Sequence, residues 1–405
     1  AASDVYKRQL RASISQTGND ALLNSDNEYD RSIQYLNTYG FTEHGVVFGG
    51  EESKRLYAVR TPNPNITWEV GTTYNVGLDF KFLQNRLSWE TDVFYHKRTN
   101  MLISRNASLP EITGITLPRE NLGEMKNRGF ESLVSWQDKI GEVEYGASLN
   151  MTYARNEITF WDEVQNVPEY QFSTGRPVGS RNMLLYVADG IFHTQAEIDE
   201  ARAKGLLYSD NTVPGDIRFK DMNGDGVIDE LDKTNCGNNV PKVTWGLTNN
   251  FSYKGIELSI FMDGVSKCNL INLGKKETTQ SRGIVRGYWR DRWRSPEQPG
   301  NGREPRACTT DNLTTPSDWW LEDASFWRIR NINIAYNFPQ SLMSKISFIS
   351  NCRIYFSMDN VYMHDHYNHM AQNAPFSNSN LTPGVDYDSG YPLARTYQFG
   401  INVKF

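Results

Sequence analysis

The sequence predicts an all-β fold, a transmembrane antiparallel β-barrel with long extracellular loops, from three observations. Ten segments of about ten residues alternate apolar with polar side chains, as in strands whose two faces meet different surroundings. Turns of a few residues alternate with connections of roughly 20 to 90 residues, which is typical of outer-membrane barrels. Aromatic residues make up 12% of the chain and apolar residues only 38%, which favours many half-buried strands over one large core.

The first five strands are predicted from residues 10–16, 73–82, 87–97, 125–136 and 143–153. In the fifth segment, Val143 and Tyr145 share one face and Glu144 lies on the other. Short turns at residues 84–86 and 138–141 close two hairpins, whereas the stretch after residues 18–19, up to residue 65, is expected to be polar and irregular.

The last five strands are predicted from residues 243–253, 256–262, 326–338, 353–361 and 396–405. The alternation changes phase near Asn331, which indicates a β-bulge. The longest connection, residues 155–240, is expected to contain a helix near residues 195–202.

A membrane barrel would place every short turn on the periplasmic side, with the apolar face in lipid and the polar face in the lumen. Aromatic residues near the strand ends would form interfacial girdles: Tyr74, Trp89, Tyr95, Tyr145, Tyr153, Trp245 and Tyr253. The alternative is that these aromatics pack a soluble β core. Because an open sheet edge in lipid leaves hydrogen-bonding groups unsatisfied, we expect N-terminal strands to be missing from this chain.

Composition excludes other classes of protein. The net charge of −6 and the isoelectric point near 5.7 argue against nucleic-acid binding. Long apolar windows typical of membrane helices are absent. Cys236, Cys268, Cys308 and Cys352 show no C-x-x-C spacing, although Cys268 and Cys308 share one loop region in which they could pair. Residues 1–9 fit nothing downstream, and we expect them to be a foreign segment.

The most specific local motif is DMNGDGVIDELD at residues 221–232, which matches an oxygen-rich calcium loop with Gly226 at its sharp sixth position. The expected ligands are the side chains of Asp221, Asn223, Asp225, Asp229 and Asp232 and the backbone carbonyl of Val227. Because Asp232 replaces the usual glutamate, we expect an affinity on the order of 0.1 to 1 mM. A short strand precedes the loop and no helix follows it, unlike in an EF-hand; the alternative is a turn with solvated carboxylates.

Two further clusters have functional and structural interpretations. Trp289, Trp293, Trp319 and Trp320 could stack on sugar rings in an extracellular vestibule or could pack the loops. His364, His366 and His369 could bind a metal, although solvated loop histidines are the preferred interpretation. No nucleophile, base and orienting group occur at a recognisable spacing, so we expect no enzyme.

Several motifs resemble the C-terminal part of SusC/RagA-type TonB-dependent outer-membrane transporters. They are LRAS at 10–13 with TGN at 17–19, PNITWE at 64–69, GLDF at 77–80, LQNRL at 83–87, NRGFE at 127–131, PGDI at 214–217 with the 221–232 loop, and YPLARTY at 391–397 with Phe405. One departure follows Val361, where residues 362–369 read YMHDHYNH and family members often show Asp-Pro-Glu.

The resemblance implies that these are the last ten strands of a 22-stranded barrel with an upstream plug. It further implies nutrient import of glycans, oligosaccharides or peptides, with a SusD-like surface lipoprotein as a lid and TonB as the energy source. The C-terminal strand would engage the barrel-assembly machinery through Tyr397, Phe399, Ile401, Val403 and Phe405. The second hypothesis is a secreted β-rich calcium-binding module with a dockerin-like loop.

Overall fold

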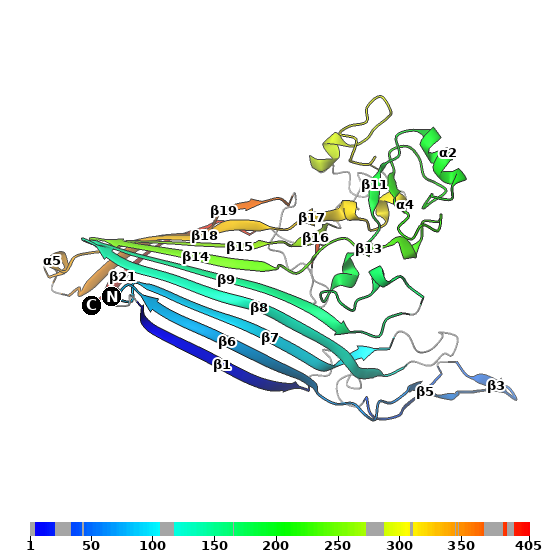
Figure 1. Cartoon of the computed structure of the whole chain (residues 1–405), viewed down its shortest axis with the longest axis horizontal. Coiled ribbons are helices and arrows are strands. Elements are labelled where there is room, and N and C mark those ends of the chain that lie inside the picture. Colours follow the sequence, from blue (N-terminus) through cyan, green and yellow to red (C-terminus); the bar gives the residue numbers. More distant parts are fainter. Residues whose placement is uncertain are drawn as a thin grey trace.

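The computed structural model describes residues 5–20, 34–42, 44–105, 117–164, 166–272, 287–307, 311–344, 346, 348–367, 384–386 and 393–405. Ten antiparallel strands form one curved sheet in the order β1-β6-β7-β8-β9-β14-β15-β18-β19-β21 (Figure 1). Their bounds are β1 Val5–Asn19, β6 Glu69–Phe82, β7 Leu87–Ser104, β8 Arg119–Ile140, β9 Val143–Phe160, β14 Val243–Tyr253, β15 Ile256–Ser266, β18 Phe326–Asn337, β19 Asn351–Asp365 and β21 Thr396–Lys404.

All ten strands predicted from the alternating pattern are confirmed, but several are longer than predicted. β7, β8 and β9 have 18, 22 and 18 residues, and each extends past the end of its apolar alternation. β1 begins at Val5, and residues 5–9 pair with residues 79–82 of β6. Residues 7–9 therefore continue the first strand in register, and the register shifts between Val5 and Lys7. The origin of this segment stays a prediction, and residues 1–4 lie outside the described residues.

The short turns all lie at one end of the sheet, which is also the end at which both chain termini are marked (Figure 1). Lys254 and Gly255 join β14 to β15 with φ of +48° and +85°, the positive values that a two-residue hairpin of the right twist requires. The turn between β18 and β19 contains the helix α5, Gln340–Met343. The long excursions leave from the opposite end, as predicted.

The predicted bulge is confirmed. The pairing of β18 with β19 changes register between Ile329 and Asn331, and the pairing with β15 changes register between Phe261 and Met262. One extra residue in β18 accounts for the change of apolar phase in the sequence.

The excursions contain small elements of their own. The predicted helix is α2, Gln195–Ala203, capped by the Thr194 hydroxyl, which accepts the Glu197 N–H. Short strands form small separate sheets: β10 Leu184–Leu185 with β13 Thr234–Asn235, β11 Ala188–Ile191 with β12 Ile217–Phe219, and β16 Asn269–Asn272 with β17 Leu321–Asp323 and β20 Val385–Asp386. Helical turns are η2 Glu169–Gln171, η3 Ser180–Met183, η4 Glu230–Asp232, η6 Gly287–Asp291, α4 Asp311–Thr314 and η7 Asp318–Trp320.

One part of the early chain is more ordered than expected. The sequence predicts an irregular stretch from residue 20 to residue 65, but β2 (Thr38–Phe41) pairs with β5 (Leu56–Arg60), and β3 (Val46–Phe48) pairs with β4 (Glu51–Ser53). Both pairings are short and local, and three of the four strands are rich in apolar and aromatic residues, with the sequences TYGF, VVF and LYAVR.

The two faces of the main sheet differ in their surroundings. Large apolar side chains on one face, called here the apolar face, are exposed over most of the sheet: Leu10, Ile14, Tyr74, Val76, Val93, Phe130, Leu149, Phe251, Ile334, Phe356, Phe399 and Ile401. A soluble β core would bury this face, so the soluble-core alternative is wrong. Within the described part of the chain, no helix is long and apolar enough to cross a membrane.

Candidate functional site

The polar face of the sheet, opposite the apolar face, contains cross-strand charge networks. Arg11 of β1 donates hydrogen bonds to Asp79 of β6 at 2.9 Å and to Asp92 of β7 at 2.8 Å. Asn75 also donates to Asp92 at 2.8 Å. Gly77 lies beneath this cluster, and a Cβ there would come within 2.4 Å of a carboxylate oxygen of Asp92. The glycine therefore leaves the space that the ion pairs occupy.

A second network follows β15, β18 and β19. The guanidinium group of Arg328 donates to both carboxylate oxygens of Asp263 at 2.8 and 2.9 Å. Farther along the same face, Asn331 donates to Asp359 at 2.6 Å. These ion pairs and hydrogen bonds give the charged groups partners within the polar face, which stays polar.

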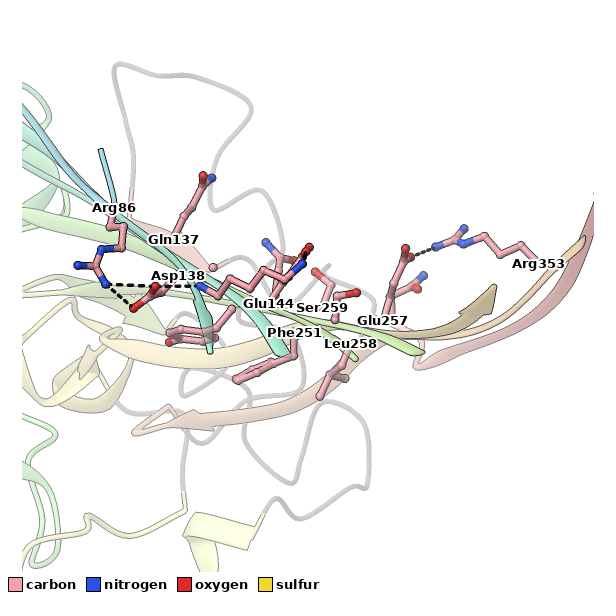
Figure 2. Close-up of a pocket in the computed structure, with 15 residues that line it drawn as sticks. Arg86, Gln137, Asp138, Glu144, Phe251, Glu257, Leu258, Ser259 and Arg353 are labelled. Carbon is pink, nitrogen blue, oxygen red and sulfur yellow. Dashed lines mark hydrogen bonds and ion pairs between the residues drawn. The ribbon is translucent and has the colours of Figure 1, made fainter. Parts of the chain in front are cut away.

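A hollow of 740 Å³ lies at the short-turn end of the sheet (Figure 2). Arg353 and Glu257 form an ion pair of 3.1 Å there, and Lys139 pairs with Glu144 at 2.7 Å. Amide and hydroxyl side chains such as Asn250 and Ser259 complete the lining. Such a wall offers hydrogen bonds to a polar solute or to a packed protein segment, and its carboxylates are already neutralised by cations.

The excursions at the other end build a hydrophobic cluster, called here the loop core. Its buried members are Tyr186, Ile217, Phe219, Ile228, Trp289 and Leu313. Asn312 is buried beside it and donates to the backbone carbonyl of Ile217 at 2.8 Å. Segments almost a hundred residues apart in the chain are therefore held in one packed unit above the sheet.

Three of the four tryptophans are buried within the excursions, which contradicts the sugar-stacking prediction for these three. Trp289 and Trp320 are 1% exposed and Trp293 is 8% exposed, so their ring faces contact protein. Trp319 packs against the loop core, and its indole N–H donates to Glu304 at 3.1 Å. The burial of Trp289, Trp293 and Trp320 supports the loop-packing alternative for these rings, whereas sugar stacking stays a prediction for the half-buried Trp319.

The predicted calcium loop forms a compact turn. Asp221 accepts the N–H groups of Gly224 and Gly226 at 2.6 and 3.0 Å, and both glycines have positive φ. Asp232 is completely buried and accepts the N–H groups of residues 222 and 229. The remaining expected ligands bond in the same local manner: Asn223, Asp225 and Asp229 each accept the N–H two residues ahead, and Val227 is exposed.

A neighbouring segment holds this loop from the side. The Tyr170 hydroxyl donates to the carbonyl of Leu231 at 2.5 Å, and Gln171 donates to the carbonyls of Glu230 and Lys233. Burial raises the pKa of Tyr170, and four nearby loop carboxylates raise it further: Asp232, Asp221, Asp225 and Asp229. The negative charges of the loop therefore converge near this one phenol.

The structure describes only some of the histidines and cysteines that the sequence singled out. His364 and His366 have ring centroids 5.5 Å apart, and His366 lies 4.0 Å from Asp323. His369 and Cys308 lie outside the described residues. Across the described ranges, no three His, Cys, Asp or Glu side chains are grouped as a metal centre requires, and Cys236, Cys268 and Cys352 are free thiols.

Within the described part of the chain, the last strand, β21, pairs with β19. Its alternate residues are all exposed on the apolar face: Tyr397, Phe399, Ile401, Val403 and, just beyond the strand, Phe405. Phe405 stacks on Phe348 with ring centroids 6.4 Å apart.

Sequence reasoning did not identify the networks of the polar face. The sequence places opposite charges on the polar face of neighbouring strands, because Arg11, Asp79 and Asp92 all occupy polar-face positions. Pairing them required the register between strands that are 68 and 81 residues apart in the chain.

A family model described as "TonB dependent receptor-like, beta-barrel" matches residues 5–361. The chain belongs to this TonB-dependent receptor family. Its ten-stranded sheet is therefore an arc of an outer-membrane barrel, with the apolar face toward lipid and the polar face as the inner wall.

Relatives agree with this assignment. The TonB-dependent receptor P26 of Formosa agariphila is 26% identical over 98% of this chain and 40% of its own length. The TonB-dependent receptor SusC of Bacteroides thetaiotaomicron is 25% identical over 85% of this chain and 32% of its own. The chain thus spans about two fifths or less of these receptors.

A solved structure with the same fold is that of the RagAB peptide importer in an open-open state. It superposes with a TM-score of 0.73 at 21% identity, and the match covers all of this chain and 41% of the other. The predicted fold class, the SusC/RagA-type resemblance and the outer-membrane location are confirmed.

Proposed function

We propose that this chain is part of a TonB-dependent importer of nutrients too large for passive pores. The observation that carries the proposal is the two-sided sheet: an exposed apolar face in lipid and an inner wall with charge networks such as that of Arg11, Asp79 and Asp92. Such a wall suits polar solutes, because the charges of these networks are already paired and a solute can exchange hydrogen bonds with them without desolvating an isolated ion.

The substrate class and the partners are part of the same proposal. Glycans, oligosaccharides and peptides are the candidates, and similarity to the RagAB peptide importer supports peptides among them. A SusD-like surface lipoprotein would cover the extracellular end, where the loop core offers a packed platform. TonB would supply energy through a region upstream of the matched strands.

Uptake by cells tests the proposal. A strain lacking the complete gene should lose uptake of a subset of labelled peptides or oligosaccharides, and the restored gene should return it. A protonophore should abolish the restored uptake, because TonB draws on the proton gradient. Equal uptake with and without the gene, or uptake that resists the protonophore, would contradict the proposal.

We also propose that Ca²⁺ binds the 221–232 loop as a structural brace. The order of oxygen-bearing side chains supports it, although the side chains are not grouped around one point and their oxygens would have to turn from backbone amides toward the ion. Chelation and the double substitution Asp221→Asn and Asp225→Asn should both speed proteolysis of this excursion. Asp210→Asn, at an exposed residue on the same excursion, is the control. Unchanged cleavage in both cases would refute the brace.

The C-terminal strand is proposed as the contact for the barrel-assembly machinery. Its exposed aromatic side chains on the apolar face support this role. Phe405→Asp should reduce the amount of folded barrel in the outer membrane, whereas Lys404→Gln should not. Equal yields of both variants would argue against it.

A further inference from the structure

Two arginines face each other on the lipid-facing side of the barrel. Arg128 of β8 and Arg155 of β9 are direct register partners, and both are exposed. Side chains that are direct partners in antiparallel strands have Cβ atoms about 5 Å apart, and like charges in such pairs are destabilising. Among the described residues neither guanidinium group has a carboxylate partner, so the repulsion is not relieved within this part of the chain.

The orientation of the pair follows from the alternation of the strands. Phe130 and Tyr153 are the register partners two residues away, and their rings stack with centroids 5.9 Å apart on the apolar face. Residues two apart in a strand share a face, so Arg128 and Arg155 lie on the apolar face also. Tyr95 of β7 pairs with Arg128 and extends the aromatic row beside it.

The depth of the pair follows from the length of the apolar alternation. In β9 the lipid-facing series runs from Val143, next to the short turn, to Tyr153, and a membrane strand needs about 9 to 11 residues to cross the hydrocarbon layer. Arg155 is the next residue in that series. The arginine pair therefore lies just outside the hydrocarbon layer, at the level of the headgroups of the outer leaflet.

The charges next to the pair are already balanced. One row farther out, Lys97 pairs with Glu124 at 3.0 Å and Lys126 pairs with Glu157 at 2.8 Å. The two arginines are therefore the uncompensated charge in this part of the lipid-facing surface.

We infer that Arg128 and Arg155 together bind the phosphate group of an outer-leaflet lipid. A phosphate between two guanidinium groups accepts forked hydrogen bonds from both and removes their repulsion. A lipid supplies this phosphate at the right depth, because its acyl chains would lie against the exposed Phe130 and the neighbouring Tyr153.

The test uses the complete natural polypeptide that carries this sequence, purified in detergent and placed in nanodiscs. The nanodiscs contain phosphatidylcholine alone or with one fifth phosphatidic acid, whose exposed phosphate monoester is the probe. Native mass spectrometry counts the retained acidic lipid. We expect Arg128→Gln with Arg155→Gln to lower the affinity for phosphatidic acid by about tenfold or more. The matched control removes two exposed arginines of the excursions, Arg290→Gln with Arg303→Gln, and should leave retention unchanged.

Three results would overturn the inference. One is equal retention in the double variant and the control. Another is retention that does not differ between phosphatidic acid and phosphatidylcholine. The third is displacement of the lipid by millimolar inorganic phosphate, which would make the pair a site for free phosphate. Heat-modified gel migration of the double variant establishes that its barrel is folded.

Discussion

The carboxylate of Asp216 is completely buried and accepts a hydrogen bond of 2.7 Å from the guanidinium group of Arg306, ninety residues later in the chain. The backbone N–H of Arg306 also donates to the carbonyl of Gly215 at 2.9 Å. Both contacts join one excursion to the next, so the loop core depends on two segments that enter from different pairs of strands.

Removing the guanidinium group of Arg306 should destabilise the loop core. Arg306→Ala removes the guanidinium group from its ion pair with the buried carboxylate of Asp216, and the loss of one member of a buried ion pair costs on the order of 3 to 5 kcal/mol of local stability. Limited proteolysis of intact cells should cut the excursions much faster than in the parent protein. Arg303→Ala, at an exposed position three residues earlier, is the control. Equal cleavage of the two variants would show that the ion pair is not needed.

Gly215 should not tolerate a side chain. Its φ is +92°, and a Cβ would lie 2.3 Å from the Trp293 ring. Gly215→Ala should therefore displace this tryptophan and destabilise the loop core by roughly 2 to 5 kcal/mol, from overpacking and backbone strain together. Gly190→Ala separates the two effects, because Gly190 has φ of +84° and open space around its Cβ position. If both variants resist protease equally, the contact with Trp293 is unimportant.

The inner wall should be sensitive at Gly77. In Gly77→Ala the added methyl group would displace Asp92 or Arg11 from their ion pair, so the barrel should unfold at a lower temperature on heat-modifiability gels. We expect a loss of about 1 to 3 kcal/mol. Gly146→Ala on the same face is the control, since its nearest atom would be 3.8 Å away. If Gly146→Ala lowers the unfolding temperature as much as Gly77→Ala does, the loss of stability is a general effect of replacing strand glycines and does not come from the displaced ion pair.

The extracellular thiols should react slowly at neutral pH. Burial raises the pKa of Cys236 to about 11, with a contribution from Asp318, and burial raises that of Cys268 to about 11. A raised pKa means less thiolate at pH 8, so maleimide-type labelling should be about ten- to a hundredfold slower than at an ordinary thiol.

The labelling rate should keep rising up to about pH 11. The experiment uses Cys308→Ser with Cys352→Ser, and the reference is Ser53→Cys in a background without the native cysteines, because Ser53 is exposed. A rate that levels off near pH 9, as for the reference, would contradict the raised pKa.

The strands were predictable from sequence, but their ends were not. Strands that cross lipid must alternate apolar with polar side chains, so the segment from Val143 to Tyr153 was recognisable. Beyond Tyr153 the outer face of the same strand carries Arg155 and Glu157. The apolar alternation therefore stops there, although the backbone hydrogen bonds to β8 continue. The bulge at β18 was visible because it shifts the apolar phase.

The loop core was not predictable for a different reason. Trp289 and Trp320 carry no periodic pattern, and their burial depends on contacts with segments far earlier in the chain, such as those of Tyr186 and Leu185. The calcium-type motif was recognisable from its local spacing, whereas its clamp by Tyr170 is a long-range contact of 61 residues.

The joining of the excursions also constrains how such barrels can recombine. β16 pairs with β17 and with β20, and Asn312 bonds to the carbonyl of Ile217, so three successive surface segments share one framework. A chimera that exchanges only one of them with a related receptor would mismatch partners contributed by the other two. We therefore expect these segments to be inherited together, while the small hairpins at residues 38–60 can be exchanged singly.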